Sequence, residues 1–230
     1  MTGGPERVDT PSLDIGAKIR AARRQQKLSL RELAAKADVS ASLISQIEGG
    51  KINPSVVTLY NITSALSLRI DTFFPVNTEK VANTDGEREP HAHYPPAASH
   101  KDEERGSAER MGLNNHHHKA SSPVVRPMNR ATIELMGGVT WARLTAEQER
   151  GIEFLEICYD VGADSGPAFQ HHQGREFGLI LEGELQLELG FDRYVLHAGD
   201  SIIFDSTTPH RLTNIGHIPV RAVWVVFKQL

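Results

Sequence analysis

Hydrophobic residues recur at two different spacings along the chain, and the change of spacing divides it into two parts. Within residues 14–74 they return every three or four positions, as Ile15 and Ile19 do, which predicts consecutive helices. From residue 124 onward the spacing becomes two, and residues 185–189 alternate leucine with polar side chains. Many short strand-like runs separated by glycines predict a sandwich or a jelly-roll barrel.

Polar residues mark where the predicted helices begin. Ser29 is followed three positions later by Glu32, the spacing of a capping box, which predicts a helix running to about residue 37. Ser40 is suited to cap the next helix. Asn53 and Pro54 are suited to the cap and first turn of a fourth helix. The first part of the chain is therefore expected to be all helical.

A third kind of sequence separates the two patterned regions. Residues 77–122 are rich in charge and proline and lack a periodic apolar pattern, which is typical of a flexible linker. Six of the eleven histidines of the chain lie there. Histidines without fixed geometry bind transition metals weakly, so a metal-binding role for the linker is not expected. The expected domains are 1–76, with its core at 14–74, the linker 77–122, and 123–230.

Charge and cysteine content narrow the class of protein. Residues 1–76 contain ten Lys and Arg against seven Asp and Glu, whereas the remainder contains fifteen against twenty-two. A mildly basic end joined to an acidic remainder is compatible with nucleic-acid contact at one end. Cys158 is the single cysteine, so no disulfide can form within the chain, and a buried inert thiol is expected. With no apolar run long enough to span a bilayer, we expect a cytoplasmic protein without membrane contact.

The motifs of the first part resemble the lambda-repressor-like helix-turn-helix class, the XRE family. The resemblance covers the whole predicted unit and implies five helices. It rests on these segments: Ser29-x-x-Glu32-Leu33-Ala34, Val39-Ser40-x-Ser42, and Ile47-Glu48-x-Gly50-x-x-x-Pro54-Ser55-x-x-Thr58-Leu59.

The same resemblance assigns roles to individual side chains. Residues 40–48 would form the recognition helix, and double-stranded DNA would be the partner. Arg23 should pair with Glu48 and brace the first helix against the third. Arg31 and Lys51 should contact phosphates. Ser40, at the start of this helix, is expected among the DNA-binding residues. The residues expected to face base edges are Ala41, Ser42, Ser45 and Gln46.

The second part resembles the cupin superfamily, an all-β double-stranded β-helix, so the expected fold class is a multidomain α and β protein. In the family, two histidines and a glutamate of a first motif meet a histidine of a second motif on one metal. The matching positions here are Gln170, His172, Glu176 and His210, so glutamine replaces the first histidine, with His171 beside it. Two imidazoles and a carboxylate can still hold a divalent metal such as Zn, Fe, Mn or Ni. Alternatively, these side chains form a polar cluster that recognises an effector directly.

Strand periodicity indicates which side chains face the barrel interior. If Glu176 points inward, so does Gly178, and a glycine there leaves room for a small molecule. Phe177 and Leu179 then point outward and need cover from another sheet or a second subunit. Four aromatic residues are expected to pack rather than to stack on a ligand: Trp141, Tyr159, Phe204 and Trp224.

Together these features predict a homodimeric DNA-binding transcriptional regulator, not an enzyme, whose cupin domain mediates dimerisation and binds a small effector. A helix-turn-helix makes few contacts, so two copies on a roughly palindromic site are expected. The main alternative is a metal-dependent cupin oxygenase or isomerase with a DNA-targeting head. An antitoxin-like partner of another protein would explain the helices but not the barrel.

Overall fold

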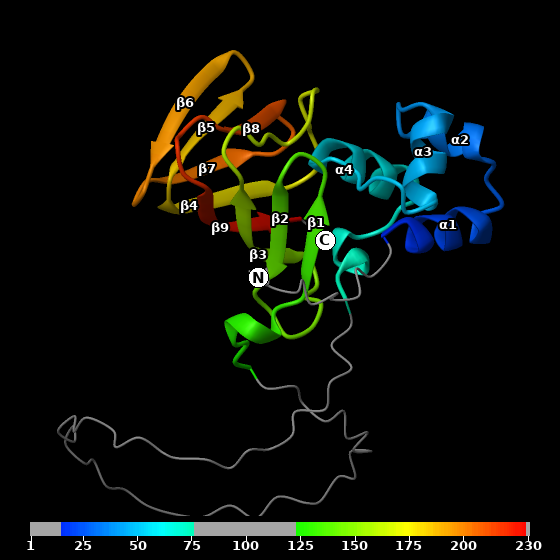
Figure 1. The fold of residues 1–230 in the computed structure, drawn as a ribbon, viewed down its shortest axis with the longest axis horizontal. Helices are drawn as coiled ribbons and strands as arrows, with labels where there is room; N and C mark the ends of the chain where they lie inside the picture. Colours follow the sequence, from blue (N-terminus) through cyan, green and yellow to red (C-terminus); the bar gives the residue numbers. More distant parts are fainter. Residues whose placement is uncertain (1–14, 76–122, 229–230) are drawn as a thin grey trace, which may run out of the picture. The chain divides into compact units, whose positions relative to one another are not determined.

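The computed structural model describes residues 15–75 and 123–228, and these two stretches belong to one compact unit (Figure 1). The first stretch is helical and the second is built of strands, as the change in hydrophobic spacing predicts. The predicted linker, with its six histidines, lies outside the described residues.

The helical region contains four α-helices and one 3-10 helix in the described residues. The expected arrangement of five helices is not confirmed as such, because the fifth element is a single 3-10 turn. The elements are α1 (Ile15–Gln25), α2 (Leu30–Lys36), α3 (Ala41–Glu48), α4 (Val56–Ala65) and η1 (Ile70–Phe73).

Side-chain caps fix the starts of α2 and α3. Ser29 Oγ accepts a hydrogen bond from the Glu32 backbone N–H at 3.2 Å, and the Glu32 carboxylate accepts one from the Ser29 N–H at 2.7 Å. Ser40 Oγ accepts a hydrogen bond from the Leu43 N–H at 3.0 Å. Both predicted caps are confirmed, and they satisfy N–H groups that a helix leaves unpaired at its start.

The prediction for the start of α4 is wrong by two residues. The N-cap is Ser55, whose hydroxyl accepts a hydrogen bond from the Thr58 N–H at 3.2 Å. Asn53 and Pro54 precede the helix, and the Pro54 carbonyl instead accepts a hydrogen bond from the Met136 N–H at 2.9 Å. A serine directly after the proline offers the same capping chemistry as asparagine, so the local sequence alone does not decide between them.

The β-region forms two antiparallel sheets after a short 3-10 helix, η2 (Pro127–Asn129). The order in the larger sheet is β1-β2-β3-β9-β4-β7, and in the smaller sheet β6-β5-β8. The inward side chains of both sheets belong to one hydrophobic core. The strands are β1 (Thr132–Leu135), β2 (Val139–Arg143), β3 (Ile152–Tyr159), β4 (Arg175–Glu182), β5 (Glu184–Leu189), β6 (Asp192–His197), β7 (Ser201–Asp205), β8 (His210–Asn214) and β9 (Val220–Phe227).

Strand β4 confirms the predicted alternation. Glu176 and Gly178 are buried between the sheets, whereas Phe177 and Leu179 remain exposed. The register pairs Gly178 with Trp224 of β9, so the large indole lies over the position that has no side chain.

Candidate DNA-reading helix and barrel site

Helix α3 presents a polar face. Ser42, Ser45 and Gln46 are exposed, while Ile44 and Ile47 are buried in the core. This division follows from the helical period, which places the two isoleucines on one side. The exposed side is chemically able to donate and accept hydrogen bonds at base edges.

The remaining residues predicted to contact DNA lie at the start of α3, just after its end, and in the first turn of α2. Ala41 is half-buried in the first turn of α3, and the hydroxyl of Ser40 is used by the cap. Arg31 in the first turn of α2 and Lys51 after α3 are both exposed. Exposed cations on either side of α3 are suited to phosphate contact.

A buried ion pair holds α3 against α1. Arg23 Nε and Nη2 donate to the two carboxylate oxygens of Glu48 at 2.6 and 2.7 Å, and Arg23 Nη1 donates to the Leu28 carbonyl at 2.8 Å. The hydrogen bonds to Glu48 raise the pKa of the Arg23 guanidinium against the effect of burial. The pairing expected from the XRE resemblance is present, in the bidentate geometry that favours arginine.

Within the barrel, the predicted site residues converge on one point. His172 Nε2 and His210 Nε2 lie 2.9 and 3.1 Å from the same oxygen, Glu176 Oε1. One ligand atom from each of the three residues lies within 4.8 Å of the others, so the three could hold a metal ion. Gln170 is buried beside them, and its backbone N–H and C=O both bond to the backbone of His210 at 2.9 Å.

Four polar side-chain atoms at the centre of this cluster, one from each residue, have no hydrogen-bond partner. Gln170 Oε1, His172 Nε2, Glu176 Oε1 and His210 Nε2 are all buried without a well-aligned hydrogen bond. His210 Nδ1 lies 2.9 Å from the Thr208 carbonyl, which can only accept, so Nδ1 carries a proton. In a neutral imidazole the Nε2 lone pair then faces the carboxylate. The cluster therefore needs positive charge at its centre, which imidazole protons or a divalent cation can supply.

The electrostatics of Glu176 agree with that requirement. Burial raises the pKa of its carboxyl, but the imidazoles of His172 and His210 outweigh burial and hold the pKa well below its usual range. The carboxylate is thus ionised in the folded protein, the form that a metal or a cationic hydrogen-bond donor requires.

Sequence analysis missed the group that orients this carboxylate. Trp224, expected only to pack, donates a hydrogen bond from Nε1 to Glu176 Oε2 at 2.6 Å. The bond leaves Oε1 as the oxygen that faces the histidines. The register of β4 against β9 carries this information, since Gly178 is what allows the indole to approach.

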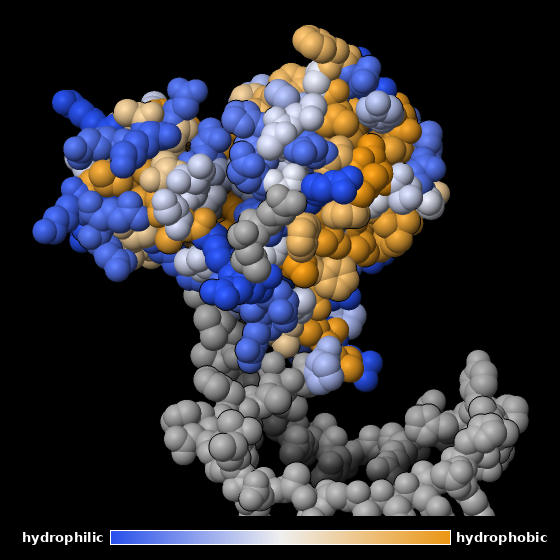
Figure 2. Space-filling model, turned by 180° about the vertical axis from the view of Figure 1, so that it is seen from behind, coloured by the Kyte–Doolittle hydropathy of each residue, from blue (hydrophilic) through white to orange (hydrophobic). Residues whose placement is uncertain are grey.

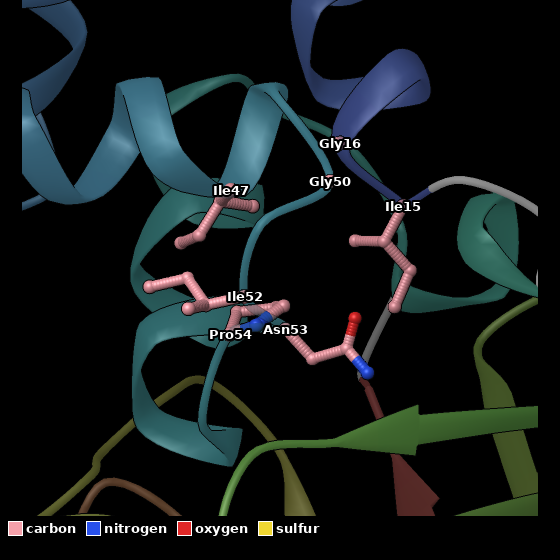
Figure 3. Close-up of a pocket in the computed structure, with 7 residues that line it drawn as sticks. All are labelled: Ile15, Gly16, Ile47, Gly50, Ile52, Asn53 and Pro54. Atoms are coloured by element: carbon pink, nitrogen blue, oxygen red, sulfur yellow. The ribbon is translucent and has the colours of Figure 1, made fainter.

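Two cavities differ sharply in chemistry. The larger, of about 300 Å³, lies between the start of α1 and the loop after α3, where the side chains of Ile15 and Ile47 approach from different segments (Figure 3). Asn53 is the one polar side chain among the seven residues that line it, so it lacks the convergent polar groups of a ligand site. The smaller, of about 10 Å³, lies beside Gln170 and Glu176 within the barrel.

Cys158 is half-buried, and burial raises the pKa of its thiol, which disfavours the nucleophilic thiolate. None of the helices in residues 15–75 and 123–228 combines the length and the apolar character needed to cross a bilayer.

Comparison with known proteins finds a separate family match for the helical region and for the β-region. A helix-turn-helix family model matches residues 19–73, and a cupin domain model matches residues 155–226. The HTH-type transcriptional regulator PuuR of Escherichia coli is 26% identical over 202 residues, covering 86% of each chain. The chain is a helix-turn-helix transcriptional regulator with a cupin domain.

One solved structure shares the fold over almost the whole chain, and a further relative matches a short segment. A crystal structure of an HTH_3 family transcriptional regulator from Vibrio cholerae covers 95% of this chain and 97% of its own, with a TM-score of 0.56 and 19% identity, which shows the common fold. An uncharacterised HTH-type transcriptional regulator of Sinorhizobium fredii, y4dL, is 45% identical over 56 residues, or 24% of this chain and 29% of its own.

Proposed function

We propose that this regulator recognises its operator through the exposed face of α3. The observation that carries the proposal is the ion-paired α3, which presents Ser42, Ser45 and Gln46 outward while its other face is buried. A rigid helix with such a face fits the major groove, where glutamine can bond to adenine in bidentate fashion. In this proposal Arg31 and Lys51 hold phosphates.

Substitution of Gln46 and Lys51 should separate base reading from phosphate contact. After selection of the preferred operator from genomic fragments, Gln46→Ala is expected to lower affinity for that operator by about 1–3 kcal/mol and to relax preference at one base position. Lys51→Ala is expected to weaken binding to all DNA sequences equally and to reduce the slope of log affinity against log salt concentration by about one. Gel shifts across a salt series measure both. An unchanged sequence preference in Gln46→Ala contradicts the assignment.

We further propose that the protein dimerises through its cupin domain. The register aligns Phe154, Val225, Phe177 and Ile203 in one row across four neighbouring strands. Phe154, Phe177 and Ile203 are 37%, 39% and 50% exposed, a hydrophobic row on an outer sheet face. Figure 2 shows hydrophobic side chains gathered over one side of the β-region. A footprint of the wild type on the selected operator should contain two half-sites about one helical turn apart, whereas a single half-site would contradict dimeric binding.

For the barrel, we propose that Gln170, His172, Glu176 and His210 bind a divalent metal and, with it, a polar effector. The support is that each of the four residues has one buried polar side-chain atom without a hydrogen-bond partner. An amide oxygen is a weaker ligand than the imidazole that the family has at the position of Gln170. The competing possibility is that the same cluster binds the effector without a metal.

Restoring the family's histidine should strengthen metal binding. We expect Gln170→His to raise affinity for Zn²⁺ and Ni²⁺ at least about tenfold, because it adds a third imidazole. His210→Ala should remove stoichiometric binding, and His171→Ala, a change at an exposed neighbour, should have no effect. Equilibrium dialysis followed by elemental analysis measures all four proteins. No stoichiometric metal in the wild type and no gain in Gln170→His would favour the metal-free cluster.

We propose a sensing role, not a catalytic one, for the cupin domain. The support is that PuuR, which the chain matches over 86% of each sequence, is named a transcriptional regulator. Oxygen consumption by the metal-loaded protein above that of free metal would instead support the alternative of a cupin oxygenase.

A further inference from the structure

The cavity at the barrel cluster is closed in part by the helical region. Its volume of about 10 Å³ corresponds to about one water molecule. Strand residues form most of its wall, but Val56 and Tyr60 of α4 complete it. A metal ion therefore fits with α4 in place, whereas an organic effector does not.

Tyr60 lines this cavity and packs against the site histidine. Its ring stacks on the imidazole of His172, with centroids 4.4 Å apart and planes inclined by 12°, and it meets Trp141 edge-on at 6.0 Å. Its hydroxyl donates a long hydrogen bond of 3.4 Å to the buried carboxylate of Glu153, which also pairs with Lys228 at 2.5 Å. The face of the Tyr60 ring thus lies against the site histidine, and its hydroxyl end meets a buried carboxylate.

The same helix is joined to the barrel at its first turn. The Val57 N–H donates to the Ser165 carbonyl at 3.0 Å, across from the N-cap Ser55. Gly166 lies so close to Ser55 that a Cβ at Gly166 would come within 2.9 Å of the serine oxygen. On its other side, α4 buries Leu59 fully in the helical core. Tyr60 therefore belongs to a helix that contacts both the barrel and the core of the helical region.

We propose that Tyr60 is an internal plug of the effector pocket, and that an effector and α4 compete for the same volume of the barrel. The effector class that fits is a small planar ring with a hydrogen-bond donor, because that molecule reproduces the stack on His172 and the bond to Glu153. The proposal rests on the proposed effector binding by the cupin domain. It makes displacement of α4 the physical link between ligand and DNA, since the ligand prefers the undocked state.

A cavity variant of the full chain tests the plug. Tyr60→Ala empties a ring-sized volume, and p-cresol, the side-chain analogue of tyrosine, is the probe. The chain has two tryptophans, Trp141 and Trp224, and both line the cavity, so tryptophan fluorescence reports occupancy. The matched control is Tyr194→Ala, which removes an exposed tyrosine of β6.

The expected result is saturable, one-to-one p-cresol binding to Tyr60→Ala, at least ten times tighter than to the wild type or to Tyr194→Ala. Hydrogen exchange followed by mass spectrometry should show at least tenfold faster exchange in the first turn of α4 of Tyr60→Ala, which p-cresol slows by filling the vacated volume. In the wild type, where p-cresol and the Tyr60 ring compete for that volume, saturating p-cresol should instead speed exchange in α4. Equal p-cresol binding by wild type and Tyr60→Ala, or no binding by a folded Tyr60→Ala, overturns the proposal. So does unchanged exchange in α4.

Two further features keep the test decisive. If Tyr60→Ala does not fold, Tyr60→Val leaves part of the ring volume empty and is judged by the same two criteria. Neither measurement uses DNA, metal or a natural effector. A negative result therefore contradicts the proposed role of Tyr60 without bearing on operator or metal binding. A negative footprint or dialysis result, in turn, does not contradict the proposed role of Tyr60.

Discussion

Glu48→Ala is expected to unfold the helical region at temperatures at which the wild type remains folded. The change leaves the Arg23 guanidinium buried without the carboxylate that it contacts at 2.6 and 2.7 Å. Arg23 and Glu48 are only 9% and 5% exposed, so water cannot replace the lost partner. Removing one member of a buried pair costs about 3–5 kcal/mol, a large part of the stability of a small domain.

Thermal unfolding followed by far-ultraviolet circular dichroism measures this loss, and operator affinity should fall with it because α3 loses its brace. The matched control is Arg24→Ala, which removes an exposed cation next to Arg23 and should change stability by no more than about 0.5 kcal/mol. A loss below about 1 kcal/mol in Glu48→Ala would show that the pair is not needed to hold α3.

Gly178→Ala should lower both the stability of the barrel and its affinity for a metal. A Cβ at this position would lie 2.2 Å from Trp224 Cζ3, so the indole must move. The same indole donates the 2.6 Å hydrogen bond that orients Glu176. Overpacking of this kind costs about 3 kcal/mol, and the variant should also lose metal affinity because Glu176 Oε1 is no longer held toward the histidines.

Gly162→Ala separates the steric effect from the backbone effect. Unlike Gly178, Gly162 has a positive φ of 76°, and nothing lies within 4 Å of a Cβ built there, so alanine should cost about 1 kcal/mol through backbone strain alone. Denaturant unfolding of both variants and of Gly178→Ala combined with Trp224→Leu gives the comparison. Partial recovery of stability in the double variant is expected, and full additivity of the two losses would argue against the clash.

Much of the helical region can be predicted from short-range patterns. The capping box at Ser29 and Glu32 and the cap at Ser40 are local, because each joins residues three positions apart. The start of α4 was less predictable, since Ser55 and Asn53 offer similar capping chemistry. In addition, the Pro54 carbonyl accepts a hydrogen bond from the N–H of Met136, a residue far along the sequence. The fifth helix that the family resemblance implies is the 3-10 turn η1. Four residues are too few for the spacing of apolar residues to distinguish a 3-10 turn from an α-helix.

The sequence by itself determined which side chains face inward in α3 and β4, because a period of 3.6 or of two assigns faces without knowledge of any partner. Through family resemblance it also brought together Arg23 with Glu48, and His172 with Glu176 and His210. Only the tertiary structure decided that Trp224 holds Glu176 and that Tyr60 closes the barrel cavity. Those contacts join residues 48 and 112 positions apart, where no periodicity operates and the packing of complete elements sets the distance.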